Sequence, residues 1–292
     1  MTRCLIVQSD GEHKGQDGWT PNWYLRECYA LQHAFRANGV DADIWGRRHD
    51  NFAEQPDFER YDLLLCAENY ELDWLPRFAA IRRPLKLQWI VDLHCQDPRR
   101  YLPVSEGCDV VLHSTRRLIK RYARRVPHAR HLWFPNAVDD RYFDAGRHPS
   151  DKRWDVMFVG SPHSSRDAVL AELERRVGLR RMFITGADML ACVAAARIHF
   201  NCNIGADINY RTFETIGLGT CLVTNADSDL TRLGFEDGVN CLTYRTTRRA
   251  VHAIETALRD GSWRAIGEHG YRLSRRHTYT CRVRDLLATL RS

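Results

Sequence analysis

Short apolar runs alternate along the chain with longer stretches of helical periodicity. In the first half, five apolar runs have the length and composition of buried strands. Between the first two, apolar residues from Leu25 to Phe35 recur at helical spacing, and Gly39 follows as a stop signal. This alternation predicts a parallel sheet with crossover helices. The five predicted strands are 4–8, 42–45, 63–66, 87–91 and 110–113.

A second series of the same kind follows a stretch rich in Pro, Asp and Gly that lacks periodicity and is typical of a linker. The chain is therefore predicted to form two Rossmann-like α/β domains that face each other across a cleft. The predicted divisions are an N-terminal domain at 1–134, a linker at 135–150, a C-terminal domain at 151–275 and a final helix at 276–292. The second series predicts strands at 154–161, 182–186, 198–203 and 221–225 and helices at 166–178, 187–197 and 209–217.

The composition is that of a globular protein, with 44% hydrophobic residues among 292. No apolar run approaches the roughly 20 residues that cross a bilayer, and the first residues do not resemble a signal peptide. The 10 cysteines are scattered without a C-x-x-C pair. We therefore expect a cytoplasmic protein with buried thiols and no metal site.

The formal net charge is +6 and is carried mainly by arginine. The densest basic run is 116–131, where five cations surround a short predicted helix. This run is typical of a solvated surface helix. A patch for an anionic acceptor, for nucleic acid or for a membrane surface is the alternative. The cations are Arg117, Lys120, Arg121, Arg124 and Arg125.

The stretch NYRTFETIGLGT at 209–220 carries the clearest chemical signal. Asn209 or Asp207 is expected to cap a short helix that leads into a strand. Arg211 then lies in the first turn, where the helix dipole favours an anion. It is either paired with Glu214, three residues later, or it faces an anion from outside.

Two glycines at the end of this stretch favour the second alternative. Gly217 and Gly219 allow close approach by a ligand or another strand. A diphosphate at Arg211 and at the helix N-terminus would suit this arrangement, with Glu214 accepting hydrogen bonds from ribose hydroxyls. Neither the G-x-G-x-x-G nor the G-x-x-x-x-G-K-[ST] motif is present.

Several stretches together resemble the C-terminal half of GT-B glycosyltransferases, in particular the branch typified by spore-maturation proteins. NYRTFETIGLGTCLVTN, LGFEDGVNCLTY and the terminal stretch through HTY carry the resemblance. FPNAVDDRYF resembles the domain junction of such enzymes, with Ala137 in place of a glycine, and DVMFVGSPHSSR resembles the opening of their donor domain. The resemblance covers most of 133–292.

This resemblance implies transfer of a sugar from a nucleotide-diphosphate sugar, expected to be UDP-linked, with no cofactor and no obligatory metal. By position it assigns phosphate binding to Arg211 and ribose binding to Glu214. Ala206 stands where many relatives have an acidic residue, with Asp207 beside it, so the resemblance does not assign the usual sugar contact to this position. The other implied donor-binding residues are Gly160, Ser161, Arg166, Asn209 and Thr212.

The catalytic base is expected where the strand at 87–91 ends. Asp92 and His94 are two residues apart and would share one face of an extended segment. A carboxylate beside an imidazole is a plausible general base for a hydroxyl acceptor, although capping and ordinary polar contacts explain the pair equally well. Glu68 and Asp17 are further candidates after other strands. Nearby aromatic residues could stack on a sugar, but core packing is commoner; they are Trp19, Trp23, Tyr70 and Trp74.

The sequence thus predicts a glycosyltransferase that moves a sugar from a UDP-sugar to a hydroxyl acceptor. A DNA-modifying glycosyltransferase acting on hydroxymethylated bases is the first alternative, with DNA or an anionic glycan held by the basic run. A nucleotide-binding module without catalysis is the second. The final helix has Tyr279, Val283, Leu287 and Leu290 at helical spacing. The resemblance implies that this helix crosses back onto the first domain, where it would hinge the pair.

Overall fold

The computed structural model describes residues 2–10, 27–141, 143, 152–205 and 207–291. The chain divides into two compact units. The N-terminal unit consists of Met1–Asn136 and Tyr279–Ser292, and the C-terminal unit is Ala137–Thr278. Of the linker predicted at 135–150, only residues 135–141 and 143 lie among the described residues.

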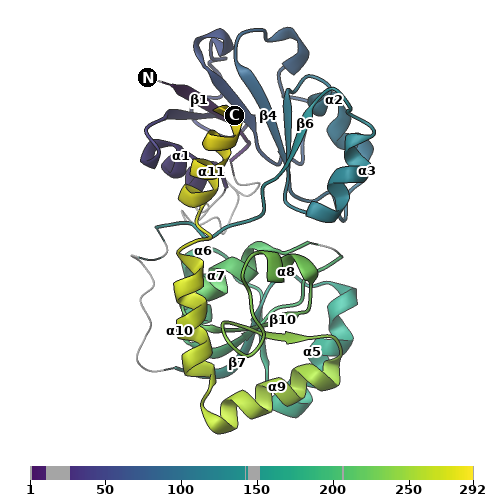
Figure 1. The fold of residues 1–292 in the computed structure, drawn as a ribbon, viewed down its shortest axis with the longest axis vertical. Coiled ribbons are helices and arrows are strands. Elements are labelled where there is room, and N and C mark those ends of the chain that lie inside the picture. Colours follow the sequence, from purple (N-terminus) through teal and green to yellow (C-terminus); the bar gives the residue numbers. More distant parts are fainter. Residues whose placement is uncertain (1, 11–26, 142, 144–151, 206, 292) are drawn as a thin grey trace. The chain divides into compact units, whose positions relative to one another are not determined.

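The N-terminal unit is built on a parallel sheet of six strands in the order β2-β1-β3-β4-β5-β6 (Figure 1). The five predicted strands are confirmed within two residues at each end, whereas β6 was missed. Its residues are mostly half-exposed, so they lack the apolar run that marks a buried strand. The strands are β1 (Arg3–Val7), β2 (Asp41–Trp45), β3 (Leu63–Cys66), β4 (Leu85–Ile90), β5 (Val110–His113) and β6 (Arg130–Trp133).

Short helices and one long pair accompany this sheet. Helix α1 lies beside α11, the last helix of the chain, and the Asn38 side chain donates a hydrogen bond of 3.0 Å to the Thr280 carbonyl next to α11 (Figure 1). The Trp89 ring of β4 also packs edge-on against Tyr279. The C-terminal end of the chain therefore completes the N-terminal unit. The helices are α1 (Glu27–Ala37), α2 (Leu102–Ser105), α3 (Ile119–Ala123) and α11 (Tyr279–Arg291).

The C-terminal unit has a second parallel sheet of five strands in the order β11-β10-β9-β7-β8. A strand was predicted at 182–186, and this position is wrong: β8 ends at Met182. Phe183, which follows it, is 64% exposed. Its apolar side chain therefore lies on the surface and does not belong to a buried strand. The short strand β11 was not predicted. The strands are β7 (Trp154–Val159), β8 (Arg180–Met182), β9 (Ala196–Phe200), β10 (Cys221–Asn225) and β11 (Leu242–Tyr244).

The helices of this unit bury apolar faces against the sheet and against one another. The predicted close approach at Gly217 is explained by packing, because a Cβ there would meet Val138 Cγ2 at 2.7 Å. The carbonyl of Gly219 likewise lies close to Gly267 in α10. The space at these glycines is therefore taken up by other residues of the same unit. The helices are α5 (Ser164–Val177), α6 (Gly186–Ala194), α7 (Tyr210–Gly217), α8 (Ser228–Arg232), α9 (Thr247–Asp260) and α10 (Trp263–Ser274).

All 10 cysteines appear as thiols and six of them are buried. Of the helices in the described ranges, none combines the length and apolar character needed to span a bilayer.

Candidate functional site

In the C-terminal unit, the order in which successive strands are added to the parallel sheet reverses between β7 and β9. From β7 the chain crosses to β8 on one side, and then returns to β9 on the other side of β7. In open α/β sheets, ligands bind beyond the carboxyl ends of the two strands at such a switch point. The loop after β7 contains Gly160 and Ser161, and the segment after β9 leads into α7 with Asn209 and Arg211. The predicted donor-binding residues therefore gather at this switch point.

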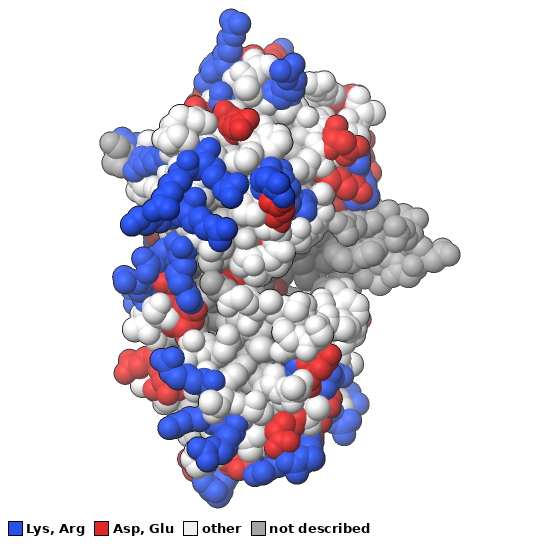
Figure 2. Space-filling view, turned by 90° about the vertical axis from the view of Figure 1, so that its right-hand side faces the viewer, with Lys and Arg blue, Asp and Glu red and all other residues white. Residues whose placement is uncertain are grey.

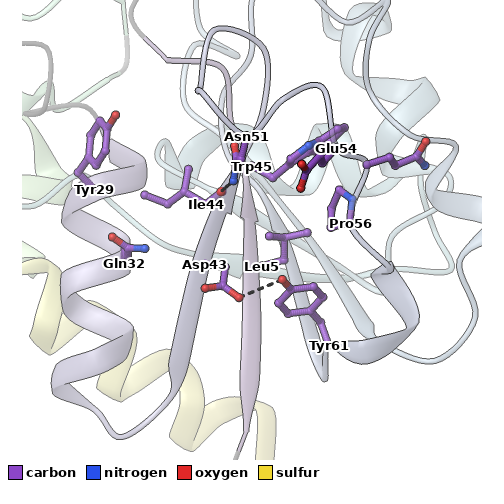
Figure 3. Close-up of a pocket in the computed structure, with 11 residues that line it drawn as sticks. Leu5, Tyr29, Gln32, Asp43, Ile44, Trp45, Asn51, Glu54, Pro56 and Tyr61 are labelled. Carbon is purple, nitrogen blue, oxygen red and sulfur yellow. Dashed lines mark hydrogen bonds between the residues drawn. The ribbon is translucent and has the colours of Figure 1, made fainter.

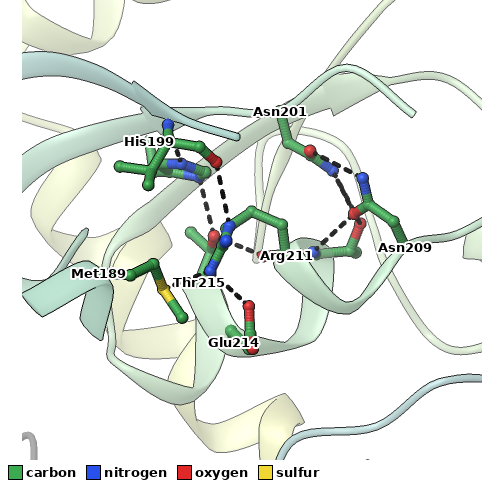
Figure 4. A network of polar contacts seen from close by, with 9 residues as sticks. Met189, His199, Asn201, Asn209, Arg211, Glu214 and Thr215 are labelled. Atoms are coloured by element: carbon green, nitrogen blue, oxygen red, sulfur yellow. Dashed lines mark hydrogen bonds and ion pairs between the residues drawn. The ribbon is translucent and has the colours of Figure 1, made fainter. Parts of the chain in front are cut away.

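A polar network holds the start of α7 in place (Figure 4). The Asn209 side chain caps the helix by accepting a hydrogen bond of 3.2 Å from the Thr212 main-chain nitrogen, which confirms Asn209 rather than Asp207 as the cap. Asn209 in turn exchanges hydrogen bonds with Asn201, which also donates to the Thr212 hydroxyl. Thr212 is fully buried, so it is a structural member of this site. Sequence reasoning missed Asn201, although its place at the end of a predicted strand was a signal.

Arg211 extends from the first turn of α7 toward the end of β7 (Figure 4). Its Nε donates to the Val159 carbonyl at 3.2 Å, and Nη1 lies 2.6 Å from Glu214 Oε2 and close to the Met189 sulfur. Both charged side chains are largely buried, with relative exposures of 18% and 13%. The ion pair between Arg211 and Glu214, the alternative that the sequence analysis did not favour, is therefore present in the structure.

His199 is a second residue that sequence reasoning missed. It is linked to the Arg211 main chain through Thr215. Its Nε2 accepts a hydrogen bond from the Val159 main-chain nitrogen, and its Nδ1 lies 2.9 Å from the Thr215 hydroxyl, which donates to the Arg211 carbonyl. Burial, together with the charge of Arg211, lowers the pKa of His199, so the ring is neutral. The neutral tautomer with hydrogen on Nδ1 satisfies each contact in this chain.

Arg166, on α5, holds the two loops at the switch point together. Its Nε donates to the Cys202 carbonyl at 3.1 Å and its Nη1 to the Ser161 carbonyl at 3.2 Å. The residue is only 9% exposed, and burial lowers its pKa. The charge of Arg211 also lowers it. Within the described residues Arg166 has no carboxylate partner, so a buried positive charge remains without a counterion at this position.

Gly160 leaves room for Arg166 and for a small pocket. A Cβ at Gly160 would meet the Phe158 ring at 2.9 Å and Arg166 Nη1 at 3.5 Å. A pocket of about 130 Å³ opens beside this glycine, with Phe158, His163 and the exposed Phe183 among its lining residues. An aromatic pocket next to a buried arginine is a suitable place for a planar base.

In the N-terminal unit the switch point lies between β1 and β3. Glu68 follows β3 and is 5% exposed. Its carboxylate accepts hydrogen bonds from the Val91 main-chain nitrogen at 2.8 Å and from the Tyr101 hydroxyl at 2.9 Å. Burial is the main cause that raises the pKa of Glu68 to about 7, and the nearby Asp92 carboxylate adds to it. The Glu68 side chain thus joins the ends of β3 and β4.

Asp92 and His94 follow β4, but the segment is a turn and not the extended strand expected from the sequence. The main-chain nitrogens of Cys95 and Gln96 both donate to the Asp92 carbonyl at 3.0 Å. The turn nevertheless brings together a carboxylate oxygen of Asp92, a ring nitrogen of His94 and the sulfur of Cys95, all within 4.8 Å of one another. Sequence reasoning missed Cys95 because it assumed alternating side chains.

Tyr70 fixes the Asp92 carboxylate by donating a hydrogen bond of 2.8 Å to Oδ2. Arg100 donates to the Tyr70 carbonyl and lies over the Tyr70 and Tyr101 rings. Trp74, in contrast, packs against Trp45 in the core of the unit, as is common for aromatic residues. Three predicted residues, namely Asp17, Trp19 and Trp23, lie outside the described residues.

Residues 147–288 match the model of a family described as glycosyl transferase-like. Solved glycosyltransferases also share the fold over almost the whole length. An alpha-glucosyltransferase in complex with UDP-glucose and DNA has a TM-score of 0.72 at 10% identity, with 99% of each chain covered.

Two further solved structures have a TM-score of 0.67, and 99% of each chain is covered in both comparisons. They are a sucrose-phosphate synthase from Thermosynechococcus elongatus, at 14% identity, and Anabaena HepE in complex with UDP and glucose, at 11% identity. Among curated proteins, none matches this chain by sequence. The predicted α/β fold with two Rossmann-like domains of the GT-B type is confirmed, and the family model and these neighbours together support a glycosyltransferase.

Proposed function

We propose that this protein transfers a sugar from a UDP-sugar to a hydroxyl acceptor, and that its C-terminal unit binds the nucleotide diphosphate. The proposal rests mainly on Arg166, a buried cation at the β7–β9 switch point. Its guanidinium donates to two carbonyl oxygens and has no carboxylate partner among the described residues. A buried charge is costly unless it is paired. A diphosphate would supply the missing negative charge.

Arg211 and the first turn of α7 complete this anion site. The Arg211 guanidinium is already oriented by Val159 and Glu214, so little side-chain entropy is lost when a phosphate binds. The helix dipole adds favourable electrostatics at the same end. Because two guanidinium groups and a helix terminus neutralise the diphosphate, we propose that nucleotide binding needs no metal ion.

For the ribose and the base we propose Glu214 and the pocket beside Gly160. A carboxylate accepts hydrogen bonds from a vicinal pair of hydroxyls, and Glu214 lies next to Arg211 in α7. The pocket with Phe183 offers an exposed ring for stacking. Solved neighbours carry UDP or UDP-glucose; this supports a uridine nucleotide here. The prediction that this chain belongs to the spore-maturation branch of these enzymes rests on the motifs at 209–225 and stays a prediction.

In the N-terminal unit we propose Asp92 as the general base that takes the proton from the acceptor hydroxyl. Tyr70 orients its carboxylate, and the half-buried position leaves the other oxygen available to an acceptor. Glu68 is enclosed by Val91 and Tyr101. It is therefore proposed as a positioning residue for the end of β4.

The experiment that tests the function is a thermal unfolding series with UDP, GDP, ADP and TDP in the presence of a chelator. A ligand that binds only the native state stabilises it by RT ln(1 + [L]/Kd), which is about 2.7 kcal/mol at a hundredfold excess over Kd. We expect UDP to raise the unfolding temperature most. An absence of any shift at millimolar concentration with all four nucleotides would refute the proposed function.

A second candidate concerns the acceptor, which we propose to be a polyanion. Four cations in and after α3 are exposed, and they make no ion pair with any described residue. Figure 2 shows Lys and Arg side chains gathered on a face of the molecule. One solved neighbour is an alpha-glucosyltransferase in complex with DNA, which favours a nucleic-acid acceptor. The four cations are Lys120, Arg121, Arg124 and Arg125, called here the basic face.

A further inference from the structure

The turn after β4 contains three side chains of the types that bind transition metals. Asp92 offers a carboxylate oxygen, His94 an imidazole nitrogen and Cys95 a sulfur, and these three atoms lie within 4.8 Å of one another. Ligand atoms around a tetrahedral zinc ion are roughly 3.3 to 3.8 Å apart, given metal–ligand distances of about 2.0 to 2.3 Å. Small side-chain rotations would therefore bring the three atoms to one ion.

We propose that Asp92, His94 and Cys95 form a binding site for Zn²⁺ or another thiophilic divalent cation. A thiolate, an imidazole and a carboxylate together suit zinc, whereas Mg²⁺ and Ca²⁺ require oxygen ligands. Three protein ligands leave one coordination position for water. When the ion binds, the Cys95 thiol loses its proton to solvent and the sulfur forms the metal bond.

The surroundings of the three ligands support a metal site. The Tyr70 hydroxyl donates to Asp92 Oδ2, an outer-shell contact of the kind that orients a metal-binding carboxylate. His94 Nδ1 is buried and makes no hydrogen bond with any described residue. Buried polar atoms in native structures almost always have a partner, so an atom without one points to a ligand.

Access and rigidity favour the same conclusion. Cys95 is exposed, so an ion can reach its sulfur from solvent. The hydrogen bonds from the Cys95 and Gln96 nitrogens to the Asp92 carbonyl fix the turn, which limits the entropy lost when the ligands close on an ion. All three ligands come from four consecutive residues, so binding requires no rearrangement of the sheet.

Metal binding at this position would inhibit the enzyme. The Asp92 carboxylate cannot take a proton from an acceptor while it binds a cation. Zinc should therefore block sugar transfer without displacing the nucleotide, whose proposed site lies in the other unit. This consequence, unlike metal binding itself, rests on the proposed function.

Cobalt binding to the metal-free full chain tests the site. We expect one Co²⁺ per chain with a thiolate-to-cobalt charge-transfer absorption, which added Zn²⁺ removes. Cys95→Ser should abolish this absorption and His94→Asn should weaken cobalt binding at least tenfold, the lower end of the effect seen for outer-shell partners. Cys192→Ser is the matched control, since Cys192 is also partly accessible, and it should keep the absorption.

Two results would overturn the metal site: an absorption that persists in Cys95→Ser, or wild-type protein that gives none. The outcome is independent of activity. If cobalt binds through Cys95 but the metal-free protein cleaves no nucleotide sugar, the proposed function fails and the metal site stands. If the metal-free protein transfers sugar and no absorption appears, the metal site alone fails.

Discussion

The Arg211 guanidinium donates a hydrogen bond of 3.2 Å to the Val159 carbonyl, which joins the first turn of α7 to the last residue of β7. This contact orients a cation at the switch point, where the order of successive strands in the sheet reverses. Arg166 approaches the same loops from α5, so two guanidinium groups lie at the switch point where we propose that the diphosphate binds.

Removal of either guanidinium should weaken UDP binding. A hydrogen bond to a charged group contributes about 1.5 to 3 kcal/mol, so Arg166→Gln and Arg211→Gln should each raise the Kd for UDP by roughly 10- to 100-fold. Glu214→Ala should also weaken binding, through loss of the ribose contact. Titration calorimetry with UDP measures these effects.

Arg175→Gln is the control for these variants, because Arg175 lies on the exposed side of α5 and pairs only with Glu172 among the described residues. Its Kd should equal that of the wild type. An unchanged Kd in Arg166→Gln would exclude this residue from the diphosphate site.

Asp92→Asn should separate binding from chemistry. The amide keeps an oxygen for the Tyr70 hydroxyl but cannot take a proton, so UDP affinity should stay near that of the wild type while kcat falls by about 10²-fold or more. Asp97→Asn is a nearby control, since Asp97 is exposed and pairs with Arg99. Steady-state kinetics with a UDP-sugar and its acceptor measure both variants. Near-normal turnover in Asp92→Asn would exclude Asp92 as the general base and leave His94, Glu68 or Asp17 as candidates.

Acid should destabilise the N-terminal unit through His113. Its Nε2 lies 2.9 Å from His131 Nδ1, and burial lowers the pKa of His113 to about 3. The folded pKa is below the unfolded value, so the contribution to stability is complete above about pH 6.5 and is lost as pH falls toward 3. Between pH 7.5 and 5.5 one such group lowers the free energy of unfolding by about 1.4 kcal/mol.

Urea unfolding at these two pH values measures the effect. His113→Phe should be less stable at pH 7.5, since it removes the hydrogen bond to His131, but its stability should fall less between the two pH values. The exposed His252→Gln on α9 should behave as the wild type. If wild type and His113→Phe lose the same stability on acidification, His113 is not the group responsible.

The basic face predicts salt-dependent binding to DNA. Each phosphate contact that is lost should reduce the slope of log K against log salt by about one, so Arg121→Glu and Lys120→Glu should weaken binding and flatten its salt dependence. Arg249→Glu on α9 changes the net charge equally at an exposed site and is the control. Fluorescence anisotropy with a labelled duplex measures these constants. Binding without salt dependence would refute a nucleic-acid acceptor on this face.

Much of the fold was predicted from local sequence alone. The runs at 63–66 and 110–113 became β3 and β5 with the same limits, because buried parallel strands are continuous apolar runs. The cap at Asn209 and its helix were also readable, since capping depends on neighbouring residues. In contrast, β6 has half-exposed residues, and only its pairing with β5 makes it a strand.

The chemistry of the site depended more on tertiary structure. The sequence determined which charged residues follow the strands, among them Arg166, Arg211 and Asp92. Only the fold decided that Arg166 is buried against two carbonyls without a carboxylate partner in the described residues, and that a turn brings His94 and Cys95 to Asp92. The reason is physical: periodicity encodes which face of an element is buried, whereas burial of a charge and convergence of side chains depend on segments that are distant in sequence.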